Sequence, residues 1–190
     1  MKPLRDFIVF LPELFTDKVK LGDTEIYIDP KWNEFDNRIM SAEVKAVPLK
    51  YKTEVEVGDT LYFHHHVVIS PNPFDVKQGL YFVRYDPLGG TATQAYAVKK
   101  KDGSIKVLGN WVFVKPILPP EKPKSLIINI YEPEEPKDKG EVYYCNENAT
   151  EYGIGVGDTV RFRGSSDYEM KINGERLWRV LLDFVDYVQN

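Results

Sequence analysis

The residues with the clearest chemical potential are three consecutive histidines, His64, His65 and His66. Imidazole nitrogens bind zinc, and a zinc site needs at least three protein ligands. The histidines follow an apolar segment typical of a strand, in which alternate residues share a face. We therefore expect His64 and His66 to lie together without His65, and the only cysteine, Cys145, is far along the chain. Because two imidazoles make an incomplete site, we predict no metal and no cofactor.

Other segments resemble catalytic motifs only superficially. The glycines within 153–157 lack the spacing of a phosphate-binding loop and precede a strand, not a helix. Residues 86–90 contain no lysine for phosphate binding. Asp59 and Asp158 each follow a turn glycine, so we expect both carboxylates to cap their turns. No nucleophile is paired with a base, and we predict that the chain is not an enzyme.

Composition narrows the class of protein. Of 190 residues, 43% are hydrophobic, and 13 glycines and 13 prolines accompany many Val, Ile, Tyr and Phe residues. This mixture favours strands and turns. The net charge of −4 argues against binding along a nucleic-acid backbone, which needs a basic face.

The expected location follows from the absence of targeting signals. The N-terminal segment carries Asp6 and Glu13 and has no long apolar stretch, so we expect no signal peptide. No segment approaches the roughly 20 apolar residues that span a bilayer. One cysteine cannot form an internal disulfide. We expect a cytoplasmic protein that binds neither nucleic acid nor membrane.

The chain consists of short strand-like segments separated by turns. Asn173-Gly174 predicts a two-residue hairpin turn between strands at 168–172 and 175–181. Segments 14–38 and 119–139 are rich in charged and turn residues and are predicted to be long loops, each with one apolar island. Further strands are expected at 6–11, 40–47, 61–63, 79–85, 94–98, 111–114, 140–145, 160–162 and 184–188.

An internal repeat organises these strands. The sequence VGDTLYF at 57–63 returns as VGDTVRF at 156–162, a spacing of 99 residues. Three further matches, spaced by 97 to 104 residues, keep the same order: 43–44 with 141–142, 80–86 with 177–183, and 4–8 with 108–112. Ordered matches at nearly constant spacing predict two copies of one all-β domain, at 1–101 and 105–190.

These segments together resemble the GroES family of co-chaperonins. The resemblance rests on their order and spacing over nearly the whole chain, and the second copy is the closer match. It implies an all-β chain of two tandem GroES-like small β-barrels with long loops. The double-length form is similar to the tandem co-chaperonins of plastids, but the chain lacks a Ser-rich transit peptide. We expect a bacterial or phage origin, in the second case with the host cytoplasm as location. The segments concerned are 2–9, 140–142, 156–162, 169–178 and 183–188.

The resemblance also implies a function. Members of the family bind the rim of a GroEL-type chaperonin ring and cap its folding chamber, while the chaperonin hydrolyses ATP. Each long loop then docks through an apolar triad, and several weak contacts in a ring add up by multivalency. Either island is alternatively a strand of the barrel. The candidate docking residues are Ile26, Tyr27 and Ile28 in the first loop, and Leu126, Ile127 and Ile128 in the second.

In the family, the last strand of one subunit pairs with the first strand of its neighbour. Here residues 95–98 run through a short turn, Lys101-Asp102-Gly103, toward the first strand of copy 2, which favours an antiparallel hairpin. Residues 4–10 and 184–188 are then left as unpaired edges, and we expect a head-to-tail, ring-like homo-oligomer. The predicted edge residues are Phe7, Ile8, Val9, Phe184, Val185 and Val188.

Three functional hypotheses remain open on the sequence. The first is a co-chaperonin. The second is a structural, assembly or adaptor protein, for example encoded by a phage, that keeps the GroES fold but no longer binds a chaperonin. The third is an enzyme of unrecognised type. We expect mobile loops in a free co-chaperonin, and loops packed or trimmed into strands in a structural protein.

Overall fold

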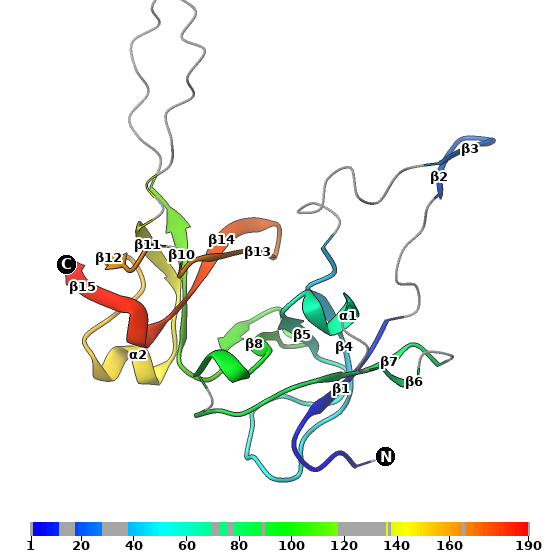
Figure 1. The fold of residues 1–190 in the computed structure, drawn as a ribbon, viewed down its shortest axis with the longest axis horizontal. Helices are drawn as coiled ribbons and strands as arrows, with labels where there is room; N and C mark the ends of the chain where they lie inside the picture. Colours follow the sequence, from blue (N-terminus) through cyan, green and yellow to red (C-terminus); the bar gives the residue numbers. More distant parts are fainter. Residues whose placement is uncertain are drawn as a thin grey trace, which may run out of the picture. The chain divides into compact units, whose positions relative to one another are not determined.

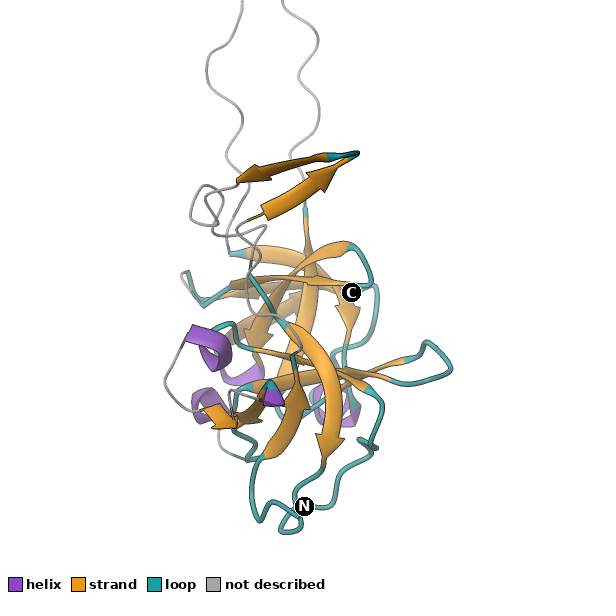
Figure 2. Ribbon diagram, turned by 90° about the vertical axis from the view of Figure 1, so that its right-hand side faces the viewer, coloured by secondary structure: helices purple, strands orange, loops and turns teal. Residues whose placement is uncertain are grey.

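The structure is a computed structural model that describes residues 2–11, 18–27, 38–69, 73–75, 78–88, 90–117, 136, 138–164 and 166–189. The chain divides into two compact units, Met1–Ile105 and Lys106–Asn190. The predicted first residue of the second copy, Ile105, is the last residue of unit 1. Antiparallel strands make up most of the regular structure of each unit, so the fold is all-β (Figures 1 and 2).

Six strands of unit 1, with β9 at the boundary between the units, form a seven-stranded sheet with the order β6-β7-β1-β4-β5-β8-β9. A short helix, α1 (His66–Ile69), follows β5, and the 3-10 turn Gly90–Ala92 precedes β8. The strands of the sheet are β1 (Phe7–Phe10), β4 (Ser41–Ala46), β5 (Thr60–Phe63), β6 (Pro73–Asp75), β7 (Leu80–Val83), β8 (Ala95–Lys99) and β9 (Ile105–Val107).

Unit 2 is built on a six-stranded sheet with the order β13-β14-β10-β11-β12-β15. Helix α2 (Glu147–Glu151) begins at Asn146, whose side chain accepts a hydrogen bond from the Ala149 amide as an N-cap. The 3-10 turn Leu182–Phe184 leads into the last strand. The strands are β10 (Trp111–Pro116), β11 (Lys139–Tyr144), β12 (Thr159–Phe162), β13 (Tyr168–Ile172), β14 (Glu175–Leu181) and β15 (Val185–Gln189).

The two sheets repeat each other strand by strand. The order β6-β7-β1-β4-β5-β8 of unit 1 matches the order β13-β14-β10-β11-β12-β15 of unit 2. Val9 pairs with Val44 in unit 1, and Val114 pairs with Val142 in unit 2. Val9 therefore corresponds to Val114. The first strands are spaced by 105 residues rather than the 104 that the sequence alignment gives.

Irregularities in the ladders recur at equivalent places. Strand β1 shifts register once against β4, as does β10 against β11. Strand β5 shifts register once against β8, as does β12 against β15. Because a bulge adds a residue at one defined point of a ladder, its recurrence supports duplication of the whole sheet. The shifts fall at Ile8/Val9 and Phe113/Val114, and at Tyr62/Phe63 and Arg161/Phe162.

The buried cores use the same positions in both units. Strand β4 alternates exposed and buried residues along its whole length, so one face of the sheet packs inward. Apolar side chains at equivalent points of four strands are fully buried. These pairs are Val9 with Val114, Val44 with Val142, Phe63 with Phe162, and Val83 with Val180.

The first predicted loop contains regular structure. Strands β2 (Lys18–Leu21) and β3 (Thr24–Tyr27) form a hairpin that is a separate two-stranded sheet. Gly22 has a φ of +63° at the first central position of the turn, as a type II′ hairpin requires. The prediction of an irregular loop is therefore wrong for residues 18–27, and most of the second loop lies outside the described residues.

No helix in the described part of the chain is long and apolar enough to cross a membrane.

Candidate functional site

The β2–β3 hairpin holds the first predicted docking segment. Ile26 lies in β3 with 43% of its surface exposed, and Leu21 at the end of β2 is 64% exposed. Leu21 pairs with Thr24, and alternation along β3 places Ile26 on the same face as Thr24. One face of the ribbon thus presents two large apolar side chains to solvent. Tyr27 ends β3, and Ile28 lies outside the described residues.

The second predicted docking segment occupies the corresponding place in unit 2. Leu126, Ile127 and Ile128 lie outside the described residues. The strands that flank them, β10 and β11, are antiparallel neighbours, as are β1 and β4 around the hairpin. Both docking segments therefore connect the same two strands of the repeated sheet.

The N-terminal strand is not an edge. Strand β1 pairs with β4 on one side and with β7 on the other, and Phe7, Ile8 and Val9 are buried. The prediction that these residues form an oligomer edge is wrong. The physical reason is that β7 returns beside β1, where Phe7 pairs with Val83, and so occupies the side that the sequence left open.

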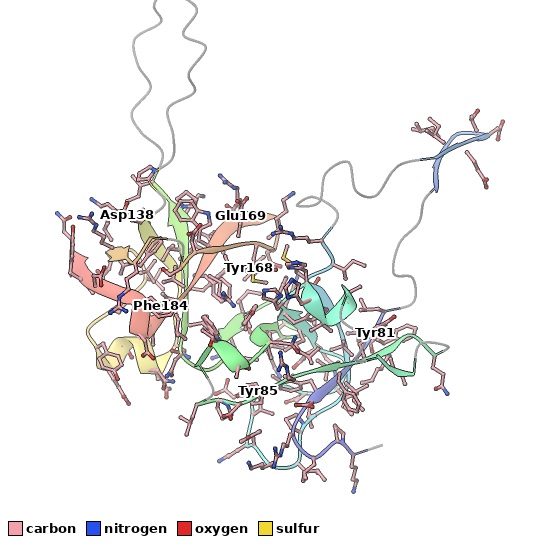
Figure 3. The ribbon with its side chains drawn as sticks, viewed as in Figure 1. Tyr81, Tyr85, Asp138, Tyr168, Glu169 and Phe184 are labelled. Carbon is pink, nitrogen blue, oxygen red and sulfur yellow. The ribbon has the colours of Figure 1, made fainter. Side chains whose placement is uncertain are left out.

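The C-terminal strand does lie at a sheet edge. Strand β15 is the outermost strand of its sheet and pairs with β12. Val185, Val188 and the preceding Phe184 are partly buried against the core of unit 2, while Tyr187 is 49% exposed. Figure 3 labels the Phe184 side chain. The predicted edge segment 184–188 thus lies at the boundary of the sheet, and the side chains that turn toward the core are those of Phe184, Val185 and Val188.

The linker covers the equivalent edge of unit 1. Strand β9 lies outside β8, to which it is joined by the turn at 100–104. The predicted hairpin after residues 95–98 therefore forms. Its second strand is β9, however, and the first repeated strand of unit 2, β10, pairs with β11 and β14 instead.

The two repeated aspartates cap their turns, as predicted. The Glu56 amide donates to Asp59 Oδ2 at 2.8 Å, and the Gly155 amide donates to Asp158 Oδ2 at 2.7 Å. Asp59 is 1% exposed and also accepts a hydrogen bond of 2.7 Å from Lys100 Nζ. This bond raises the pKa of Lys100. Both carboxylates are used in holding turns, which accounts for their repetition.

The histidines meet at the end of β5. The strand ends at Phe63, and the chain turns through His64 and His65 into helix α1, which begins at His66. The turn brings one ligand nitrogen of each imidazole within 4.8 Å of the others. The prediction that only His64 and His66 share a face is therefore wrong, because strand geometry ends before the histidines. This cluster could hold a metal ion, and it is the one such group of three side chains among the described residues.

The single thiol is poorly suited to nucleophilic chemistry. Cys145 is partly buried against the core of unit 2. Burial raises the pKa of the Cys145 thiol, and the negative charge of Asp158 raises it further. Since the thiolate is the reactive form, the group is largely protonated near neutral pH.

No protein-family model and no curated protein sequence matches this chain.

Proposed function

We propose that this chain is a co-chaperonin of the GroES type that binds a chaperonin ring and performs no chemistry of its own. The observation that carries the proposal is the apolar face of the β2–β3 hairpin, formed by Leu21 and Ile26, on a ribbon separate from the seven-stranded sheet. The proposed docking residues are Ile26, Tyr27, Ile28, Leu126, Ile127 and Ile128.

A lone hairpin such as β2–β3 is only weakly stable by itself. This two-stranded ribbon exposes apolar side chains to water as well. Burial of a Leu or Ile side chain in a partner groove contributes about 1.5–3 kcal/mol each. Ordering of the flanking chain offsets part of this gain, so each docking contact stays weak and reversible. A ring of several chains recovers affinity by multivalency.

The repeated sheet supports the same proposal. Both docking segments join the first two paired strands of a copy, so one chain offers two equivalent docking points. Strand β15 ends its sheet at an edge that can pair with another chain, which supports a homo-oligomer. Since β1 is a central strand, we propose that the oligomer uses β15 with a partner edge other than β1.

The ordered form of the hairpin favours a second candidate. Residues 18–27 are paired strands, and a structural or assembly protein with the same fold is expected to have loops trimmed into strands. Such a protein would use the apolar face of the hairpin to bind a permanent partner protein, and this binding would not depend on nucleotide. The response to ATP therefore separates the two candidates.

A pull-down of the host's own chaperonin tests the proposal. We expect the purified chain to retain chaperonin only when ATP is present, and Ile26→Asp or Ile127→Asp to abolish retention. Glu25→Gln is the matched control, because it changes charge by one unit on the opposite face of the same strand. If wild type retains no chaperonin under any nucleotide condition, the co-chaperonin proposal fails and the structural-protein candidate replaces it.

A further inference from the structure

We propose that His64, His65 and His66 form a binding site for a late first-row divalent metal ion, for which Zn²⁺ is the representative. One ligand nitrogen from each side chain lies within 4.8 Å of the other two. The ring centroids are 4.7 Å apart for His64 and His65, and 4.4 Å apart for the other two pairs. The site is independent of chaperonin binding, because it lies at the end of β5 and not in either docking segment.

The main chain holds the three histidines in place. The His64 amide donates to Gln94 O at 2.9 Å, which fixes the end of the strand. The Val67 amide then donates to His64 O at 3.0 Å and starts the helical turn. Val67 itself is 2% exposed and anchors the turn in the core. The backbone of the three ligands is therefore arranged before any metal binds, which lowers the entropy lost on binding.

The cluster is closed on one side and open on the other. His65 is 8% exposed, and the Tyr96 ring, 2% exposed, lies edge-on to His64 with centroids 6.3 Å apart. His66 is exposed to solvent. A metal ion can enter from the His66 side, where water supplies the fourth ligand of a tetrahedral site.

Small side-chain rotations complete the geometry. Zn–N bonds of about 2.0–2.1 Å at tetrahedral angles place ligand nitrogens roughly 3.4 Å apart, so the rings must approach by about an ångström. The His66 amide donates to His64 Nδ1 at 3.1 Å. A metal ion bound at Nδ1 takes the place of this donor. The amide can return to water, because His66 is exposed.

The donor set selects the class of metal. Imidazole nitrogens suit Zn²⁺, Ni²⁺ and Cu²⁺, whereas Ca²⁺ and Mg²⁺ prefer oxygen ligands. The cluster contains all three histidines of the chain, so any imidazole–metal binding by this protein must occur here. A bound ion would fasten the end of β5 to the start of α1.

The site is tested by calorimetric titration of the full-length chain, free of any histidine tag, with ZnCl₂. Titration with CaCl₂ is the negative control. We expect one Zn²⁺ per chain and no heat from Ca²⁺. His66→Gln removes one ligand at an exposed position and should weaken Zn²⁺ binding by more than about tenfold. Cys145→Ser is the control for thiol binding and should leave the affinity unchanged. His64→Gln is a second ligand variant, and circular dichroism verifies that each variant is folded.

Proton NMR of the imidazole C–H groups gives an independent readout, because three histidines give few signals. All three should shift together and saturate at one equivalent of Zn²⁺. The proposal is overturned if Zn²⁺ produces neither heat nor shifts, if the folded His66→Gln variant binds as tightly as wild type, or if Cys145→Ser abolishes binding.

Discussion

At the residue scale, Asp59 and Asp158 have the same capping role in different surroundings. Asp59 is 1% exposed and bonded to Lys100, whereas Asp158 is partly exposed and caps the Gly155 amide. Asp59→Ala removes the acceptor of the Glu56 amide and the close charged partner of Lys100, whose Nζ keeps its hydrogen bond to Glu54 O. We therefore expect a loss of roughly 2–3 kcal/mol in unfolding free energy. Asp158→Ala should cost about 1 kcal/mol. Urea unfolding of the two variants checks this, and equal losses would contradict it.

The bond between Lys100 and Asp59 also predicts a pH dependence. Its hydrogen bond to Asp59 raises the pKa of Lys100 above the ordinary value of 10.5. A raised pKa means that protonated Lys100 stabilises the fold fully below the unfolded-state pKa, and that this stabilisation is lost as pH rises through the folded-state pKa. The difference in unfolding free energy between wild type and Lys100→Met should be constant from about pH 7 to 9 and shrink above about pH 10.5.

Chemical unfolding of both proteins across this pH range measures the difference directly. Burial also raises the pKa of Tyr85. Because wild type and variant share such tyrosines, subtracting the unfolding free energy of the variant from that of wild type removes their effect. A difference that grows with alkaline pH would show that Lys100 is not stabilised in its protonated form.

At the element scale, the contact between β10 and β11 depends on a missing side chain. A Cβ atom at Gly140 would lie 2.8 Å from Val114 Cγ2 and 2.9 Å from Lys115 O. Gly140→Ala should therefore force β11 away from β10 and cost about 1–3 kcal/mol. The equivalent residue of unit 1 is Ala42, which is buried and already has a Cβ atom. Ala42→Gly is the matched control.

Urea unfolding followed by circular dichroism measures both variants. We expect Ala42→Gly to cost about 1 kcal/mol, mainly from the added freedom of the unfolded chain and the lost methyl group. Gly140→Ala should cost more, although alanine is the better residue in regular structure. A stabilised Gly140→Ala variant would mean that the two strands can separate without loss.

The sequence predicts the main strands well because local chemistry determines them. The hairpin at 168–181 is confirmed, and Asn173 and Gly174 take the positive φ values of 52° and 84° that a type I′ turn requires. The β2–β3 hairpin is missed although Gly22-Asp23 is a similar turn signal and residues 18–21 alternate charged and apolar side chains. Each strand spans only four residues, the shortest run in which alternation indicates a strand. Helix α1 spans four residues, too few for a helical period to show.

Pairing partners are harder to predict than strands. The choice of β7 as second neighbour of β1 depends on contacts such as Phe7 with Val83, which are distant in sequence. One signal against an edge was present. Phe7, Ile8 and Val9 are consecutive apolar residues without alternation, which is typical of a strand covered on both faces. The approach of three imidazoles likewise depends on where β5 ends, a boundary that sequence patterns place poorly.

At the scale of the whole molecule, the main sheet is duplicated, and further elements are added to it. The order, register and bulges repeat. The hairpin β2–β3, the histidine cluster and the covering strand β9 have no counterpart among the described residues of the second copy. The last strand of the second copy, β15, has no added strand outside it in the described sheet. The first copy thus carries the exposed apolar ribbon and the candidate metal site, while the second ends at a sheet edge.

Separate cores predict separate unfolding of the two units. Phe63 and Phe162 are equivalent residues, both buried, each in the core of its own unit. Removal of a buried phenylalanine ring costs about 3–5 kcal/mol. In calorimetry we expect two transitions, one lowered by Phe63→Ala and the other by Phe162→Ala. Trp111 and Trp178, both in unit 2, should make fluorescence follow mainly the transition that Phe162→Ala lowers. If both substitutions lower one shared transition equally, the duplicated sheets fold as a single cooperative body.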